Sequence, residues 1–484
     1  MREDRQQPTI EDEPRSEFSR KVRRTTDQST RAPSTRNRLR KTRPQRTRRL
    51  SEAIATLLPE RPFELVLWDR TRVPATDPGP TITVHSPRAL GHLLRARGQL
   101  GVVRAYVDGS IDVDDLDAAV LLGGWSPPAL PRAARARLLA SAFAAAGSGV
   151  RLPSPPVAEM RPRGRLHSQA RDARSVRHHY DLPGEFFSLF LDSSMTYSCA
   201  LFRDGAQTLD AAQEAKHELV CRKLDLHPGQ RVLDLGCGWG AFALHAAARH
   251  GVHVTGITLS PPQAEIARSR AADAGLDGRV DIRVMDYRDL RDERFDAVCS
   301  VGMVEHVGNA RLDGYARTIA SVLAPGGRLL NHGIARLPAG VHHPTPFAQR
   351  YVFPDGELTK VSGVIAALER AGFEPHHLED LRADYAETLR HWIRRLDMNA
   401  ERAEKVAGPE SLRVFQLYLR GARHGFDIGL TSVFQVLTTL RADAARRGHQ
   451  EMTGVTAAGP RASGRSRRSA LTSGQLDAGT RRAC

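Results

Sequence analysis

Cysteine is scarce in this chain, which has five cysteines among 484 residues, at positions 199, 221, 237, 299 and 484. No two of them form a C-x-x-C pair, so we expect neither a zinc site nor a disulfide framework. This usage favours a reduced compartment, and we expect a cytoplasmic protein. The chain also lacks a run of 18 apolar residues, which argues against a membrane-spanning helix. Its charged first residues do not resemble a secretory signal.

Acidic residues are few at both ends of the chain. Residues 1–50 contain 16 Lys or Arg against 7 Asp or Glu, and residues 451–484 contain 6 against 2. These segments account for +13 of the formal net charge of +16, so the residues between them are nearly neutral. Both are poor in large apolar residues, and we expect them to be disordered basic tails. Such tails suit anionic lipid or nucleic acid, or simply keep the protein soluble. The near-neutral middle has no interleaved aromatic and basic residues, which argues against a specific nucleic-acid partner.

Short strands and helices follow the first tail. The stretches "RPFELVLWDR" and "TITVHS" read as strands, and "SPRALGHLLRA" as a helix, which predicts a small α/β domain over residues 51–124. The stretch "AYVDGSIDVDDLDAAVLL" indicates a strand and turn that lead into another helix. Residues 125–165 are rich in Pro and Arg around an Ala-rich helix at 131–146, and we expect them to form a loosely packed connector.

A longer pattern of alternating strands and helices occupies residues 166–450. Strands are expected at "RVLDL", "VHVTGITLS", "VDIRVMDYRDL" and "FDAVCSVGM", with amphipathic helices between them. Units of this length predict an α/β fold with a doubly wound, mostly parallel sheet. Residues 360–450 read as mostly helical and are expected to cover the edge of that sheet.

A glycine-rich turn follows the first of these strands, at Asp234-Leu-Gly236-Cys-Gly238-Trp-Gly240. Glycines there let the backbone approach a ligand at the carboxyl end of the strand. The run also fits the loose dinucleotide pattern, through Gly236, Gly238 and Ala241. However, the next strand ends "GITLS", without the acidic residue that would bind the ribose of NAD. Asp234 suits a cationic ligand instead. The D-x-G-x-G-x-G spacing also resembles the first motif of class I S-adenosylmethionine (SAM) methyltransferases, so we favour SAM, which carries a sulfonium and an ammonium group.

Several stretches together resemble the cyclopropane-fatty-acyl-phospholipid synthase and mycolic acid cyclopropane synthase family, whose members have a class I SAM methyltransferase fold. In order, they are "HHYDLPGEFFSLFLDSSMTYSCALF", "VLDLGCGWG", "GITLSPPQ", "SVGMVEHVG", "LLNHGI", "YVFPDG" and "ADYAETLRHW". The resemblance covers about residues 166–445. The segment "AYVDGSIDVDDLD" also resembles the N-terminal domain of the longer members, which act on phospholipids.

The resemblance implies transfer of a methylene carbon from SAM to the double bond of an unsaturated phospholipid at the membrane surface. Attack of the alkene on the methyl group leaves a carbocation, and a base must then remove a proton so that the ring closes. In the family, that base is a bound bicarbonate. Water must be excluded, so the pocket should be apolar and aromatic. Such an enzyme would associate peripherally with the inner face of the membrane, as a monomer or a homodimer.

The resemblance places the bicarbonate cage on five residues. Cys199 and Ile334 would contribute backbone groups, whereas Glu305, His332 and Tyr385 would contribute side chains. Taken singly, each has a plainer interpretation, because a histidine in an apolar strand is usually a hydrogen-bonded core residue and a tyrosine can simply pack. A thiol nucleophile at Cys199 is the alternative that would need a nearby base.

For SAM, the resemblance adds Tyr180, Tyr197 and Ser198, and gives Gln263 the ribose role. Taken alone, Gln263 would be an exposed residue in the first turn of a helix. Asp286, after the third strand, is expected either to bind the adenine amino group or to cap a helix.

The chain departs from the family at "LLNHGI", where many relatives read "LLHTI". Asn331 and Gly333 therefore change the neighbours of His332, which leaves the reaction outcome open. A methylene- or methyl-branched chain could form from the same cation, and a small soluble acceptor is a further alternative. The apolar "GEFFSLFL" is either a membrane-docking surface or a core helix.

Overall fold

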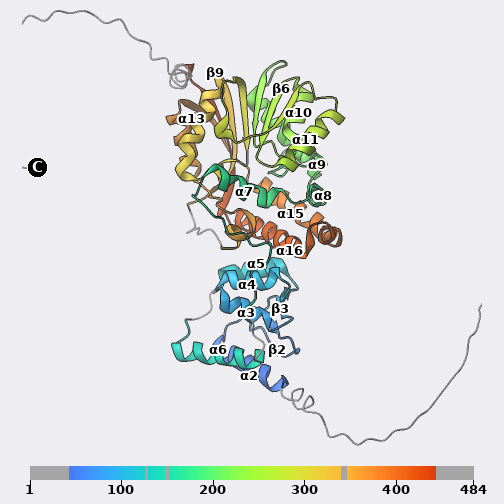
Figure 1. Cartoon of the computed structure of the whole chain (residues 1–484), viewed down its shortest axis with the longest axis vertical. Coiled ribbons are helices and arrows are strands. Elements are labelled where there is room, and N and C mark those ends of the chain that lie inside the picture. Colours follow the sequence, from blue (N-terminus) through green and yellow to red (C-terminus); the bar gives the residue numbers. More distant parts are fainter. Residues whose placement is uncertain (1–42, 97, 126–128, 148–151, 339–345, 443–484) are drawn as a thin grey trace, which may run out of the picture.

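The computed structural model describes residues 43–96, 98–125, 129–147, 152–338 and 346–442 (Figure 1). The predicted tails therefore lie largely outside the described residues. The first described helix, α2 (Arg43–Leu57), begins inside the segment that we expected to be a tail. It does so because Leu50 and Ile54 are buried in the core and hold the helix against α6 (Arg132–Ala146).

The N-terminal unit has a four-stranded sheet in the order β2-β1-β3-β4. Its strands are β1 (Glu64–Val66), β2 (Arg72–Val73), β3 (Thr81–Val84) and β4 (Ile111–Val113). Its other helices are α3 (Arg88–Arg95), α4 (Gln99–Val107), α5 (Leu116–Leu121) and the short η1 (Leu122–Gly124). The stretch "AYVDGSIDVDDLDAAVLL" begins in the buried end of α4 and then forms β4 and α5, so it contains the expected strand that leads into a helix.

A seven-stranded sheet forms the larger unit, in the order β10-β11-β9-β8-β5-β6-β7. The strands β5 (Arg231–Leu235), β6 (His253–Thr258), β7 (Val280–Val284), β8 (Phe295–Val301) and β9 (Leu323–Arg336) are parallel. Helices alternate with these strands along the chain. They are α9 (Leu209–Leu224), α10 (Ala241–His250), α11 (Pro261–Asp273), α13 (Leu312–Val322) and α14 (Val361–Arg370). The predicted doubly wound, mostly parallel α/β fold is confirmed.

The expectation that residues 360–450 are mostly helical was wrong in part. This segment contributes two antiparallel strands, β10 (Phe373–Asp380) and β11 (Thr431–Leu440), which extend the sheet beyond β9. The strand β10 lies at the edge and is mostly exposed, so its residues lack the apolar pattern of a buried strand. The helices α15 (Arg382–Met398) and α16 (Ala400–Asp427) lie between the large sheet and the N-terminal unit (Figure 1).

Short elements complete the larger unit at the carboxyl ends of its parallel strands. They are α7 (Gln169–Tyr180), α8 (Gly184–Ser188), η3 (Tyr287–Asp289), α12 (Val304–Val307), η4 (Asn309–Arg311) and η5 (Ala348–Val352). Phe186, Phe187 and Phe190 of "GEFFSLFL" are fully buried. This stretch is therefore a core helix and not a docking surface.

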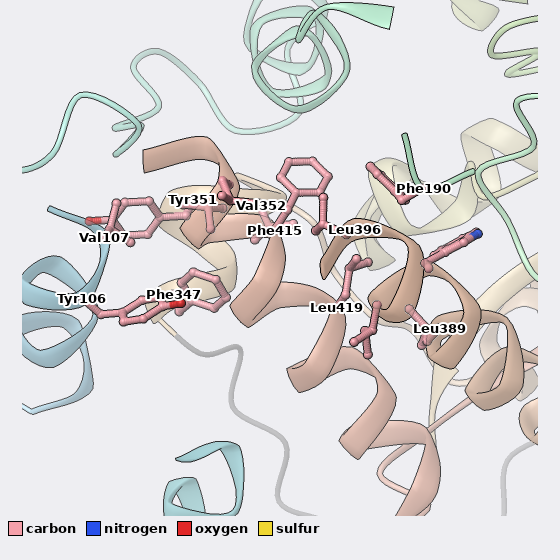
Figure 2. Close-up of a cluster of buried hydrophobic side chains, with 14 of the residues drawn as sticks. Tyr106, Val107, Phe190, Phe347, Tyr351, Val352, Leu389, Leu396, Phe415 and Leu419 are labelled. Carbon is pink, nitrogen blue, oxygen red and sulfur yellow. The ribbon is translucent and has the colours of Figure 1, made fainter. Parts of the chain in front are cut away.

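One hydrophobic cluster connects the two units (Figure 2). Tyr106 and Val107 of α4 belong to the same cluster as Tyr351 and Val352 of η5 and Phe415 of α16. The helix α16 contacts both α4 and α5 of the N-terminal unit.

The predicted connector is also packed more tightly than expected. Glu159 accepts two hydrogen bonds of 2.6 Å from Arg104, and both side chains are almost fully buried. The Tyr351 hydroxyl donates a third hydrogen bond to this carboxylate. Among the described residues, no helix is long and apolar enough to cross a membrane.

Candidate active site

A pocket opens at the carboxyl ends of β5, β6, β7 and β8, and encloses ≈ 1320 Å³ of empty space with its open mouth included. Eight of the nine residues predicted to bind SAM line it, namely Tyr180, Tyr197, Ser198, Asp234, Gly236, Gly238, Gln263 and Asp286. The ninth, Gly240, is not among the described lining residues. It begins α10 with φ +83°, and a Cβ there would lie 3.1 Å from the Cβ of Ala267, so its role is helix packing.

The glycine turn leaves room for a ligand because it lacks side chains. Gly236 has φ +89°, and a Cβ there would lie 2.6 Å from Cγ of Met303, which also lines the pocket. Gly238 has φ +54°, which an L-residue with a side chain adopts only with strain. Larger residues at either position would both strain the backbone and fill the cradle.

Asp234, at the end of β5, supplies negative charge to the pocket. It is 3% exposed, and its Oδ2 has no hydrogen-bond partner among the described residues. Burial raises the pKa of this carboxyl to about 7, against the opposing effect of the nearby Lys216 ammonium. A buried carboxylate oxygen without a partner fits a cationic ligand, so the residues present fit SAM.

Lys216 was not predicted from the sequence. It is 2% exposed in α9 and donates a hydrogen bond of 3.1 Å to Oγ of Ser198. Burial lowers the pKa of its ammonium to about 8, while neighbouring acidic groups oppose that shift. The helix buries Gln213, Lys216 and His217 on one face, and this spacing of i, i+3 and i+4 was the signal that sequence analysis overlooked.

The side chains of Gln263 and Asp286 both accept hydrogen bonds from other residues of the protein. Gln263 is 4% exposed, so the plainer interpretation of an exposed helix residue was wrong, and its Oε1 accepts a hydrogen bond of 2.9 Å from Thr258. Asp286 caps η3 by accepting from the backbone N–H of Arg288. The Arg288 guanidinium also donates to both carboxylate oxygens, at 2.8 and 2.7 Å. Arg288 itself lines the pocket, and sequence analysis did not identify it.

A second group of predicted residues lies beside the pocket, across α12. Glu305 accepts a hydrogen bond of 2.6 Å from the backbone N–H of Ile334, while its Oε2 is buried without a partner in the described part of the chain. Burial raises the pKa of Glu305 to about 7. The Ile334 amide therefore holds the glutamate, and a backbone contribution of Ile334 to the bicarbonate cage stays a prediction.

The protonation of His332 follows from its neighbours. Lys223 can only donate, and its Nζ lies 2.6 Å from Oε1 of Gln435, which turns the amide nitrogen of Gln435 toward His332. That nitrogen lies 3.2 Å from Nδ1 of His332 and donates to it. Burial lowers the pKa of His332 to about 3, so the ring is neutral and carries its proton on Nε2. This Nε2–H is buried and has no partner among the described residues. Neither Lys223 nor Gln435 was predicted.

Cys199 and Tyr385 meet at the carbonyl of Leu381. The Cys199 Sγ lies 3.7 Å from this oxygen, and the backbone N–H of Tyr385 donates to it at 3.0 Å. Burial raises the pKa of the Cys199 thiol well above its ordinary value, so the thiol stays protonated and the nucleophile alternative finds no support. Burial likewise raises the pKa of Tyr385, which remains a neutral phenol.

Partly buried aromatic rings pack together next to the two groups of residues. Tyr180 and His306 pack with ring centroids 6.1 Å apart, and Phe353 lies 5.6 Å from both His306 and Tyr418. Burial lowers the pKa of His306 to about 4, so this ring is uncharged. Sequence analysis had named only Tyr180 of these rings, because the others come from separate segments that the fold brings together.

Asn331 and Gly333 belong to the opposite face of β9 from His332. Asn331 accepts a hydrogen bond of 2.9 Å from the Tyr315 hydroxyl, beneath α13. A Cβ on Gly333 would lie 2.4 Å from Cγ1 of Val304, so the glycine allows α12 to pack closely on the strand. The two residues that depart from "LLHTI" therefore do not line the site. Gly333 instead affects how α12, the helix that carries Glu305, packs on β9.

Comparison with known proteins identifies the family of this chain. Residues 167–436 match the family described as "Mycolic acid cyclopropane synthetase". The chain is 37% identical over 385 residues to a "Probable fatty acid methyltransferase" of Pseudomonas putida, covering 78% of this chain and 91% of that protein. It is 34% identical over 363 residues to the cyclopropane-fatty-acyl-phospholipid synthase of Escherichia coli K12, covering 74% and 87%.

Solved structures give the same result. Mycolic acid cyclopropane synthase CmaA1, complexed with SAH and CTAB, is 34% identical with a TM-score of 0.52, covering 55% of this chain and 98% of that chain. Cyclopropane synthase MmaA2 from Mycobacterium tuberculosis is 31% identical with a TM-score of 0.53, again covering 55% and 98%. The chain therefore belongs to the cyclopropane synthase family of SAM-dependent methyltransferases, whose members bear the names of both cyclopropane synthases and fatty acid methyltransferases.

Proposed function

We propose that the protein transfers a one-carbon unit from SAM to the double bond of unsaturated acyl chains in phospholipids and closes a cyclopropane ring. The observation that carries this proposal is the pair of buried polar atoms without partners, Oε2 of Glu305 and Nε2 of His332, beside a pocket suited to SAM. Bound SAM would supply an electrophilic methyl group. Asp234 would attract the positive charge of SAM. The glycine turn would let SAM lie close to the protein backbone.

The second group of residues is suited to a small hydrogen-bonding anion such as bicarbonate. His332 presents an N–H donor through Nε2, and Glu305 presents a carboxylate oxygen through Oε2. Bicarbonate has both an O–H that donates and oxygens that accept, so it complements this pair of groups. It would supply the base that takes the proton from the newly added methyl group. Lys223 and Gln435 act as positioning residues, because they fix which nitrogen of His332 carries the proton.

The neutral aromatic surroundings support a cationic reaction centre. Burial raises the pKa values of Tyr180, Tyr197 and Tyr385, so these phenols carry no charge. Aromatic faces stabilise a positive charge without supplying a nucleophile to capture it. Dry packing also keeps water away from the cation, which a hydroxyl-rich pocket would not do.

Access to lipid is proposed for the N-terminal unit, at the end of the molecule farthest from the large sheet (Figure 1). The helix α6 exposes Arg132, Arg135 and Arg137 and contains no acidic residue. It also exposes Leu139 at 41% and Phe143 at 50%. Basic and apolar side chains on one exposed helix suit the interface of an anionic bilayer.

A second candidate shares the first chemical step and ends differently. Relatives named fatty acid methyltransferases are 37% identical to this chain and cover 78% and 81% of it, which favours a methyl- or methylene-branched product as the alternative. The residues of the site serve either outcome, because both pass through one cation.

Product analysis tests the proposal and separates the two candidates. The purified full-length chain is incubated with SAM, bicarbonate and vesicles of a monounsaturated anionic phospholipid, and the released acyl chains are examined by proton NMR. We expect the high-field protons of a cyclopropane ring. Signals of an exocyclic methylene or a branch methyl would support the second candidate, and unmodified acyl chains would refute both. Leu139→Ser with Phe143→Ser should reduce co-sedimentation with the vesicles, while SAM affinity stays unchanged.

A further inference from the structure

Two helices behind the cofactor pocket bring together four side chains of the kinds that bind metals. Glu218 and Cys221 lie three residues apart on α9, and His245 and His250 lie on α10. One oxygen of Glu218, Oε2, lies 3.4 Å from Nε2 of His245 and 3.0 Å from Nε2 of His250. The ligand atoms of Cys221, His245 and His250 all lie within 4.8 Å of one another.

The cluster is sheltered but can be reached from solvent. Cys221 is fully buried, whereas the side chains of His245, His250 and Glu218 are 12%, 19% and 39% exposed. In a tetrahedral zinc site with Zn–S near 2.3 Å and Zn–N near 2.0 Å, neighbouring ligand atoms lie about 3.3–3.7 Å apart. The ligand atoms of Cys221, His245 and His250 must therefore move closer by side-chain rotation to surround an ion, and Glu218 contacts the two histidines of this group.

We propose that Cys221, His245 and His250 bind one Zn²⁺ ion, with Glu218 Oε2 as the fourth ligand. One thiolate, two imidazoles and a carboxylate form the mixed sulfur, nitrogen and oxygen set that zinc accepts with tetrahedral geometry. Sequence analysis did not predict this site, because the ligands follow E-x-x-C and H-x₄-H spacings on separate helices. The absence of a C-x-x-C pair had led us to expect no zinc site.

The ion has a structural role, because it ties α9 to α10. No member of the cluster is among the described residues that line the cofactor pocket, but their neighbours are. Lys216, His217 and Val220 of α9 line the pocket, as does Phe242 of α10, and the ring of His217 packs on His245 with centroids 5.6 Å apart. A bound ion therefore fixes the back wall of the site without touching substrate.

Cobalt substitution tests the proposal directly. The tag-free, full-length chain is stripped with a chelator and titrated with Co²⁺, whose thiolate complexes give a charge-transfer absorption that histidine-only sites lack. We expect one Co²⁺ per chain with this absorption, and its loss when Zn²⁺ is added. Cys221→Ala should abolish the absorption. His245→Gln and His250→Gln should weaken Zn²⁺ binding at least tenfold, since even outer partners of a metal site are worth about 10–100-fold.

Matched controls separate metal ligation from a folding defect. His253→Gln changes an exposed histidine of the same domain and should leave the titration unchanged. His250→Gln keeps the buried cysteine in place and should bind SAM normally, yet Zn²⁺ should no longer raise its melting temperature as it does for the wild type. A wild-type titration without thiolate absorption, or Zn²⁺ affinities of the two histidine variants equal to that of the wild type, would overturn the proposal. The Glu218 contacts would then be plain hydrogen bonds.

Discussion

Replacing Glu305 with glutamine should stabilise the protein above neutral pH while removing its activity. Oε1 of Glu305 accepts from the Ile334 amide, but Oε2 is buried without a partner among the described residues. Ionising this carboxyl in the folded protein is therefore costly. Glutamine keeps the acceptor for the Ile334 N–H and carries no charge, so Glu305→Gln removes that cost.

The magnitude follows from the pKa of Glu305, which burial raises from 4.5 to about 7. Between these two values the folded state holds more protons than the unfolded state, so the free energy of unfolding falls as pH rises. At about 1.4 kcal/mol per pKa unit, the wild type loses about 3 kcal/mol relative to the variant, and the loss is complete above pH 7. Below pH 4.5 the two proteins should be equally stable.

Thermal unfolding at a series of pH values between 5 and 8, without bicarbonate or SAM, measures this difference. The melting temperature of Glu305→Gln should exceed that of the wild type by several degrees at pH 8, and the gap should close toward pH 5. Asp234 titrates in the same window, but it is present in both proteins and cancels in the difference. Glu265→Gln, at an exposed position, controls for the substitution itself. A gap that does not change with pH, or a less stable variant at pH 8, would refute the reasoning.

Three further substitutions test other parts of the site. Asp234→Asn should weaken SAM binding about 10–100-fold by calorimetry, because a hydrogen bond to a charged partner is worth about 1.5–3 kcal/mol; unchanged affinity would remove this residue from the site. Gly333→Ala places a methyl group against Val304, so we expect a loss of about 1–3 kcal/mol in stability together with slower turnover. Wild-type melting and turnover would contradict that packing. Gln435→Glu should move the proton of His332 to Nδ1 and raise the bicarbonate concentration for half-maximal turnover about tenfold or more. An unchanged bicarbonate dependence would contradict the assigned tautomer.

The sequence predicted best what local patterns determine. The strand, glycine turn and helix around Asp234 form a contiguous motif, and the structure places Asp234, Gly236 and Gly238 in one pocket as expected. The strand β10 escaped prediction because an exposed edge strand lacks apolar alternation. The start of α2 escaped because its apolar residues are few and depend on α6 for burial.

Long-range contacts account for the residues that sequence analysis missed. Gln435 lies 103 residues from His332, and only the pairing of β11 with β9 brings them together. Lys216 looks like a solvent-facing helix residue until the fold buries it against Ser198. Burial and protonation arise from tertiary packing, so a motif can name His332 but cannot say which of its nitrogens is protonated.

The central claim is that a dry site presents the methyl group of SAM to an alkene and that Glu305 and His332 hold the base. The most direct measurement follows isotopically labelled methyl carbon from SAM into the acyl chains of monounsaturated phospholipid vesicles, for wild type and Glu305→Gln at saturating SAM. We expect labelled cyclopropane rings from the wild type and at least about 100-fold fewer from the variant, since positioned acid–base groups contribute about 10²–10⁴-fold. Both proteins should bind SAM equally. Unlabelled lipid with the wild type, or equal formation of labelled rings by the variant, would contradict the claim.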